Sequence, residues 1–519
     1  MATPLRLSFL TLLPGLLAAQ SPASVQEAVS SITAADVIRR IGILADDSML
    51  GRATPSPQLD KVAAYIAAEF RRFGLKPGGG GGGDNSSYEQ RYPLTSMAIV
   101  PESSYVRLTG DVRAEWRLGR DASYFRGQAP AGGGGGRGRG GESVAEMVVV
   151  SGTPADSPAD PQQLNGKVLL FLGFGGGRLQ QAIGKAQPAA ILFAATLPEQ
   201  QWQERTERQS RPVIQFAAPE AASAPIFLVR LDRVLAALSG TGIAADTSAL
   251  TRNGLLRIRP VPGVVAHFAL RQRVMTGLSA PNVIGILEGS DPRLRHEYVF
   301  FTGHMDHLGT PGSGEGCVAR GADSICNGAD DDASGTTAVL AAAAAFSRLS
   351  PRPKRSLVFM TVSGEERGLW GSSYYTDHPT VPLADVVADL NTDMVGRNWR
   401  DTIAVIGKEH SDLGATLNRV GAAHPELHMQ PIDDIWPQEG FYFRSDHYNF
   451  ARKGVPILFF FNGTHPDYHQ VSDEVAKIDG EKESRIVKLV FYLGLEIANA
   501  IERPKWNPES FRRIVQGQN

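Results

Sequence analysis

From Ala280 to the end of the chain, short apolar runs alternate with longer stretches whose apolar residues recur at helical spacing. Such alternation indicates an α/β domain, because each helix carries the chain back to the start of the next strand. The expected strands are Asn282–Leu287, Glu297–Phe301, Ser356–Thr361, Val386–Asn391, Ile403–Ile406 and Pro456–Phe461. The expected helices are Ser334–Ser347, Leu369–Thr376, Ser411–Ala423 and Glu481–Ile501. We therefore predict a mixed, mostly parallel sheet sandwiched by helices.

Acidic and imidazole side chains follow these strands, close to where each strand ends. They are His304 and Asp306, Glu365 and Glu366, Asp393, and His469, while Asp331 lies in the loop before the helix that begins near Ser334. In open α/β sheets, ligands bind just outside the carboxyl ends of the strands. Residues that are far apart in the sequence are thus expected to meet at one edge of one sheet.

Such a gathering of charge is costly unless something neutralises it, and a divalent cation does so. Two histidines with three carboxylates form a nitrogen and oxygen ligand set that suits Zn²⁺ and could accept Mn²⁺ or Co²⁺. Five ligands are too many for one tetrahedral zinc with an open position. They fit two cations if one carboxylate bridges, an arrangement used for hydrolysis.

Six motifs come in a set order and resemble one family. They are Gly303-His304-Met305-Asp306, Gly328 to Gly335 with Asp330-Asp331-Asp332, Gly364-Glu365-Glu366, Asn391-Thr392-Asp393-Met394, Ser445-Asp446-His447, and Tyr468 to Asp473. Together they resemble the co-catalytic zinc exopeptidases related to aminopeptidase Y, secreted bacterial aminopeptidases and glutamate carboxypeptidase. The resemblance covers roughly Ala280 to Ile501. Any one motif alone is more often a surface pair, a solvated face or a turn.

The resemblance implies a ligand set for two Zn²⁺ ions per chain. Asp331 would bridge both ions. His304 and Asp393 would complete one site, and Glu366 and His469 would complete the other.

It also implies roles for three residues that do not bind metal. Glu365 would be the general base, Asp306 would hydrogen-bond His304 and fix its tautomer, and Tyr442 would donate a hydrogen bond to the tetrahedral intermediate. The family further implies a cis peptide at Asp331-Asp332. His307, His447 and His465 have no clear ligand position, and we interpret them as structural residues, although His465 could contact the substrate.

The remaining sequence indicates how the chain is divided into a signal peptide and domains. Residues 1–19 have the pattern of a signal peptide, which predicts a secreted or periplasmic protein without a stable membrane anchor. Residues 20–142 are expected to be the N-terminal part of the peptidase domain, with glycine-rich loops. Residues 143–255 resemble a protease-associated insert, and residues 256–519 would form the catalytic domain. Two helices are expected between residues 32 and 77.

The balance of charged residues limits the kinds of partner that the chain is expected to bind. The chain has 52 basic and 54 acidic residues, and this balance gives no sign of a nucleic-acid or anionic membrane partner. Its two cysteines, Cys317 and Cys326, lie close together, which favours a local disulfide in an exported protein, although two free thiols stay open.

The predicted activity is release of N-terminal residues from peptides or small proteins. The first alternative is a carboxypeptidase or dipeptidase with the same centre, for which Arg444 or Arg397 could bind a substrate carboxylate; Asp446 or Glu365 could instead bind an ammonium group. A single-zinc glutaminyl cyclase is disfavoured by the full set of five ligands, and a binding protein without activity is disfavoured by the same completeness. The sequence does not decide between the two ends of the substrate.

Overall fold

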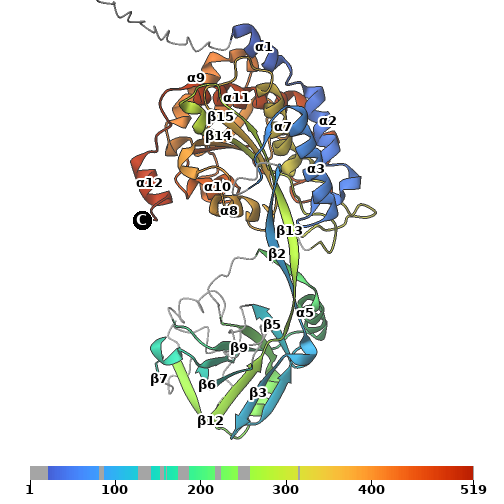
Figure 1. The fold of residues 1–519 in the computed structure, drawn as a ribbon. Coiled ribbons are helices and arrows are strands. Elements are labelled where there is room, and N and C mark those ends of the chain that lie inside the picture. Colours follow the sequence, from blue (N-terminus) through green and yellow to red (C-terminus); the bar gives the residue numbers. More distant parts are fainter. Residues whose placement is uncertain are drawn as a thin grey trace, which may run out of the picture. The chain divides into compact units, whose positions relative to one another are not determined.

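The computed structural model of the 519-residue chain describes residues 21–80, 87–126, 142–151, 157–158, 161–172, 186–216, 224–243, 257–313 and 316–517. The chain forms two compact units (Figure 1), the first made of Met1–Tyr92 with Ser279–Asn519 and the second of Pro93–Leu278. The predicted signal peptide and the glycine tract at 132–141 lie outside the described residues. Among the helices that are described, none is both long and apolar enough to cross a bilayer.

The first unit is built on a mixed sheet in the order β13-β15-β14-β16-β19-β17-β18. The strands are β13 (Gln272–Leu287), β14 (Tyr298–His304), β15 (Ser356–Val362), β16 (Val386–Thr392), β17 (Thr402–Ile406), β18 (Gln430–Ile432) and β19 (Ile457–Phe461), with the short β1 (Lys76–Pro77) paired to β13. Strands β15, β14, β16 and β19 are parallel to one another. At the two sides of this group, β13 runs antiparallel to β15 and β17 runs antiparallel to β19. All six expected strands are present, and the predicted mixed, mostly parallel α/β sheet is confirmed.

Helices cover both faces of this sheet. They are α1 (Pro22–Ser30), α2 (Ala34–Leu44), α3 (Pro57–Arg72), α7 (Gly335–Phe346), α8 (Trp370–Asp377), α9 (Leu413–Ala423), α10 (His447–Ala451), α11 (Gly480–Asn499) and α12 (Pro508–Ile514). Figure 1 shows α7 and α11 on one side of β14 and β15, and α8 and α10 on the other.

Two consecutive residues of β14 explain this sandwich, because successive strand side chains point to opposite faces. The ring of Phe300 lies 5.4 Å from that of Phe450 in α10. The ring of Phe301 instead lies 5.3 Å from that of Phe346 in α7, which in turn packs at 4.3 Å against Phe491 in α11. Both faces of β14 are therefore core, as expected for a strand with a continuous apolar run.

The two expected N-terminal helices are α2 and α3. The hydroxyl of Thr33 accepts a hydrogen bond from the backbone N–H of Asp36 and caps α2, and Ser56 caps α3 in the same way. The apolar stripe of α3 is fully buried at Leu59, Val62 and Phe70. Between these helices, residues 45–56 include Arg52 and Thr54, which both reach the candidate site.

The second unit holds a separate nine-stranded sheet, whose strands are β3 (Tyr105–Gly110), β4 (Ala114–Arg117), β5 (Ala122–Arg126), β6 (Ser143–Ser151), β7 (Ser157–Pro158), β8 (Val168–Phe171), β9 (Ala190–Ala195), β11 (Ile226–Arg230) and β12 (Arg257–Ala269). Strand β10 (Val213–Phe216) pairs with β2 (Glu89–Ile99), and the helices are α5 (Glu199–Ser210) and α6 (Leu231–Leu238). Leu169 and Leu170 belong to two different apolar clusters, one on each face of β8. In the described part of this unit, no group of side chains could hold a metal ion.

The boundaries of this unit differ from the expected insert at 143–255. The unit begins at Pro93 and ends at Leu278, because β3 pairs with β12, β4 with β3, and β5 with β11 in the same sheet. Sequence reasoning assigned these early strands to the peptidase domain because no change of composition marks them. That the unit is a protease-associated domain stays a prediction.

The structure contains the disulfide between Cys317 and Cys326. The two cysteines pack with Leu308 and Val471 in a small apolar cluster. The bridge therefore ties together the loop that follows β14.

Asp389 in β16 gives the fold a pH-dependent stability. Its side chain is fully buried, one oxygen accepts a hydrogen bond from Thr302 Oγ1 at 2.8 Å, and the other has no partner in the described structure. Burial raises the pKa of Asp389 from 3.8 to about 8. Between these two values the folded state holds a proton that the unfolded state has released, so the group contributes stability at low pH that is lost as the pH rises through that window.

We expect Asp389→Asn to remove this dependence. The melting temperature of the variant should fall less steeply than that of the wild type between pH 4 and pH 8, because an amide has no proton to lose. Thermal unfolding of both proteins in the same buffers measures the difference, and parallel curves would contradict the assignment.

Candidate metal centre

The predicted ligands all lie at one edge of the first unit's sheet. His304 is the last residue of β14, and Glu366 and Asp393 follow the ends of β15 and β16. Asp331 lies in the turn Ala329–Ser334 before α7, and its peptide bond to Asp332 is cis, as the resemblance implied. His469 lies in the loop after β19.

The first group of ligand atoms joins His304, Asp331 and Asp393. His304 Nε2 lies 3.3 Å from one oxygen of Asp331, Oδ1, and 3.7 Å from Oδ1 of Asp393. These atoms all lie within 4.8 Å of one another, which is close enough to share one cation.

The second group uses the other oxygen of Asp331. His469 Nε2 lies 3.2 Å from Asp331 Oδ2 and 3.3 Å from Glu366 Oε2. A third imidazole enters this group, because His307 Nδ1 lies 2.6 Å from Glu366 Oε1 and 3.8 Å from Asp331 Oδ2. Asp331 thus offers one carboxylate oxygen to each group.

The polar atoms of the second group are not satisfied by the protein. Asp331 Oδ2, Glu366 Oε1 and both ring nitrogens of His307 are buried. Although His307 Nδ1 and Glu366 Oε1 lie only 2.6 Å apart, none of these four atoms makes a hydrogen bond of good geometry within the described structure. Buried polar groups are normally paired, and a bound ion is one of the few explanations for such exceptions. The residues therefore fit a pair of cations, and their mixture of nitrogen and oxygen atoms suits Zn²⁺.

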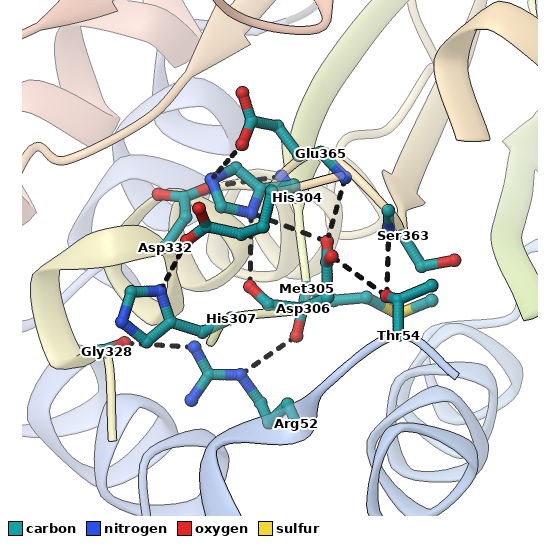
Figure 2. A network of polar contacts seen from close by, with 12 residues as sticks. Arg52, Thr54, His304, Met305, Asp306, His307, Gly328, Asp332, Ser363 and Glu365 are labelled. Carbon is teal, nitrogen blue, oxygen red and sulfur yellow. Dashed lines mark hydrogen bonds and ion pairs between the residues drawn. The ribbon is translucent and has the colours of Figure 1, made fainter. Parts of the chain in front are cut away.

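Asp306 supports the first group from behind (Figure 2). His304 Nδ1 donates to the backbone oxygen of Asp306 at 3.1 Å, and the carboxylate of Asp306 lies 3.6 Å from the same nitrogen. This contact leaves Nε2 as the ligand nitrogen. The carboxylate itself accepts from Thr54 Oγ1 at 2.9 Å and from the backbone N–H of Glu365 at 3.3 Å.

Arg52 connects the loops beneath the centre through hydrogen bonds. Its guanidinium is 1% exposed and donates to the backbone oxygens of Met305, Asn327 and Gly328, and also to that of Leu44 at the end of α2 (Figure 2). One side chain from the N-terminal segment therefore joins the loop after β14 to the turn that carries Asp331.

Asp332 and Asp473 hold the backbone of the centre in place. Asp332 accepts from the N–H groups of His304, Gly335 and Met394. Asp473 accepts from the two N–H groups of the adjacent turn, those of Asp330 and Asp331. These two acids, which belong to neither ligand group, thus accept hydrogen bonds from the backbone of the centre.

Glu365 belongs to neither ligand group but faces the same space. Its Oε2 lies 4.0 Å from His304 Nε2. Burial raises the pKa of Glu365 well above its usual range; the charge of His304 lowers it, and the carboxylate of Glu366 raises it. Carboxyl groups with raised pKa values are typical of residues that exchange protons in active sites.

A pocket of about 410 Å³ opens onto the centre. It is lined by His304, Asp331, Glu365, Asp393, Met394, Phe441, Arg444, Ser445, Phe459, Phe461, Thr464, Tyr468 and His469. Five catalytic or ligand candidates therefore share one cavity with an aromatic wall.

The prediction for Tyr442 is not supported by its position. Its side chain lies in an apolar cluster with its ring 4.6 Å from His410 and 5.6 Å from His447, and it is not among the pocket residues. The turn Phe441–Phe443 directs residue 442 into the core. Tyr468, whose ring stacks at 3.8 Å on that of His469, is the tyrosine that lines the pocket.

Sequence reasoning also missed His307 and treated it as structural. The available signal was its position one residue after Asp306, in the loop that already carries His304. His447 and His465 are indeed outside both groups, since His447 donates to the backbone oxygen of Tyr442 and His465 pairs with Asp330. The Asp446-His447 pair is thus part of a hydrogen-bond network, as expected.

Comparison with known proteins places these residues in a family. The model described as Peptidase family M28 matches residues 282–494. An aminopeptidase of Bacillus subtilis, YwaD, is 25% identical over 46% of this chain and 49% of its own length. A probable leucine aminopeptidase and a probable glutamate carboxypeptidase of Arthroderma benhamiae are 30% and 29% identical over 37% and 42% of this chain.

The chain spans 56% and 26% of the length of those two fungal relatives. Among solved structures, an aminopeptidase from Aneurinibacillus sp. strain AM-1 is 18% identical with a TM-score of 0.48, and the match covers 92% of this chain and 98% of that one. The family match includes all five predicted ligands, Glu365 and His307. Residues 282–494 of this chain are therefore similar to Peptidase family M28.

Proposed function

We propose that this chain is a di-zinc exopeptidase that releases N-terminal residues from peptides. The observation that carries the proposal is the placement of Asp331, whose two oxygens lie 3.3 Å and 3.2 Å from His304 Nε2 and His469 Nε2 in two separate groups. The match of residues 282–494 to the model of Peptidase family M28 and the similarity to curated aminopeptidases support the same class of reaction.

His304, Asp331 and Asp393 would hold one Zn²⁺, and Asp331, Glu366, His469 and His307 would hold the other. When bound, two zinc ions polarise a scissile carbonyl and lower the pKa of an attacking water. Because several of these ligands line the same pocket as Glu365, a substrate carbonyl bound at the centre would lie beside Glu365.

Glu365 would then act as general base and acid. It takes a proton from the attacking water as that water adds to the carbonyl carbon, and it returns the proton to the leaving amine as the peptide bond breaks. Tyr468, which lines the pocket, would donate a hydrogen bond to the developing oxyanion, because burial and the neighbouring carboxylates raise the pKa of its hydroxyl and keep it protonated.

Hydrolysis of aminoacyl anilides, N-blocked dipeptides and C-terminally amidated dipeptides tests this proposal, together with zinc content by elemental analysis. An aminopeptidase should cleave the aminoacyl anilide, whose N-terminus is free. It should lose this activity with a chelator and recover it with zinc. Cleavage only of N-blocked dipeptides would favour a carboxypeptidase, and one tightly held zinc without hydrolysis would favour a cyclase.

His307→Ala should weaken binding of one zinc ion by about 10–100-fold, the usual cost of losing a residue that orients or completes a metal site. The reason is its contact with Glu366 Oε1 at 2.6 Å and its complete burial. Titration with a competing chelator measures the two affinities, and His296→Ala, an exposed histidine elsewhere, is the control. Two unchanged affinities would exclude His307 from the centre.

We also propose that the protein is exported. The signal-peptide pattern of residues 1–19 and the Cys317–Cys326 disulfide both support an oxidising compartment. The N-terminal sequence of the mature protein, determined by mass spectrometry on the exported fraction, tests this.

A further inference from the structure

The pocket contains one positively charged side chain that the proposed hydrolytic mechanism does not use. Arg444 is the only arginine or lysine among the described residues that line the cavity. Of the acidic residues in the lining, Asp331 and Asp393 belong to the ligand groups and Glu365 has the role of base. The charge left over for substrate recognition is therefore positive.

The Arg444 side chain is held in place without being neutralised. Its guanidinium carbon lies 4.8 Å from the centre of the Phe441 ring, in a cation–π contact with another residue of the pocket wall. Within the described residues, its side chain makes no ion pair and no hydrogen bond. The next residue, Ser445, donates to Asp393 Oδ2 at 2.8 Å, which ties this segment to the metal centre.

The other charged candidates for substrate binding are already engaged. Arg397 pairs with Asp467 at 2.9 Å and is not among the pocket residues. Asp446 is completely buried, accepts from Ser372 Oγ, and does not line the cavity either. The described pocket thus presents a free guanidinium and no spare carboxylate for an ammonium group.

We propose that Arg444 binds a carboxylate of the substrate and makes the enzyme selective for short peptides that carry one within reach of the scissile bond. This proposal rests on the proposed function. A guanidinium forms two parallel charge-assisted hydrogen bonds with a carboxylate, which gives both affinity and orientation. The carboxylate can be the C-terminus of a dipeptide or an acidic side chain next to the cleaved bond.

The aromatic wall fits this substrate class. Phe441, Phe459 and Phe461 line the same pocket as Arg444. A pocket with an apolar wall and one positively charged side chain suits a substrate that combines an apolar side chain with a carboxylate.

Four substrates separate the possibilities: Leu-Leu, Leu-Leu-amide, Leu-Glu-amide and leucyl anilide. We expect the wild type to prefer a substrate with a carboxylate over Leu-Leu-amide by about 10–100-fold in kcat/KM, the range for a charge-assisted bidentate contact. Preference for Leu-Leu identifies the C-terminus as the bound group, and preference for Leu-Glu-amide identifies the side chain.

Arg444→Ala should remove that preference mainly through a higher KM, and Arg444→Lys should restore part of it. Arg348→Ala, an exposed arginine at the end of α7 that is absent from the pocket, is the matched control and should leave all four values unchanged. An equal loss on all four substrates in Arg444→Ala, or no carboxylate preference in the wild type, would overturn the proposal.

A binding measurement keeps this test separate from the proposed function. In a Glu365→Gln background, calorimetry should find tighter binding of the preferred carboxylate substrate than of Leu-Leu-amide, and Arg444→Ala should abolish the difference. If the wild type hydrolyses none of the four substrates, the proposed function fails, and the calorimetric difference alone then decides the role of Arg444.

Discussion

Asp331→Ala should lose zinc from both sites at chelator concentrations that leave the wild type loaded. Asp331 is the one residue whose carboxylate oxygens face both ligand groups, at 3.3 Å from His304 Nε2 and 3.2 Å from His469 Nε2. Each remaining site would keep too few ligands, so the loss of affinity should exceed the ~100-fold that removal of an outer-shell partner costs. Elemental analysis after dialysis measures the stoichiometry.

The comparison with a one-site variant makes this result specific. Asp393→Ala should empty the site of His304 and spare the site of Glu366 and His469, because Asp393 belongs only to the first group. Circular dichroism of each variant should match that of chelator-treated wild type. Retention of two zinc ions by Asp331→Ala would refute the bridging role.

Glu365→Ala should keep its zinc and lose about 10²–10⁴-fold in kcat, the usual contribution of a general base. Glu365 lines the pocket but belongs to neither ligand group, and burial raises the pKa of its carboxyl group above the usual range. Steady-state kinetics on an aminoacyl anilide, with metal content measured on the same samples, tests both parts.

The neighbouring glutamate provides a matched control. Glu366→Ala should lose zinc from the second site, since Glu366 Oε2 lies 3.3 Å from His469 Nε2. Two adjacent residues of the same type should thus fail in different ways, one in turnover and the other in metal binding. Near-full turnover in Glu365→Ala would place the base elsewhere.

Much of the first unit could be predicted because its signals are local. Apolar runs such as Ser356–Thr361 and capping residues such as Thr33 depend on neighbours in the sequence. The start of the second unit could not, because the membership of β3, β4 and β5 depends on pairing with β12 and β11, far along the chain.

The ligand set could be predicted from position at strand ends, whereas the residues around it could not. Residues in turns show no periodicity, so the sequence did not reveal that Tyr442 points into the core while Tyr468 lines the pocket. His307 was missed for the same reason, since only the path of the loop after β14 brings it to Glu366. The role of Arg52 likewise depends on contacts with oxygens more than 250 positions away.

That arginine also bears on how the protein can be dissected. A fragment trimmed to the family-matched residues 282–494 would carry every proposed zinc ligand yet omit both Arg52 and Thr54. Three backbone carbonyl groups and the Asp306 carboxylate would then lose donors that reach them from the segment between α2 and α3. A fragment that retains these contacts is consequently discontinuous in sequence, because it has to combine residues 52–54 with the later strands.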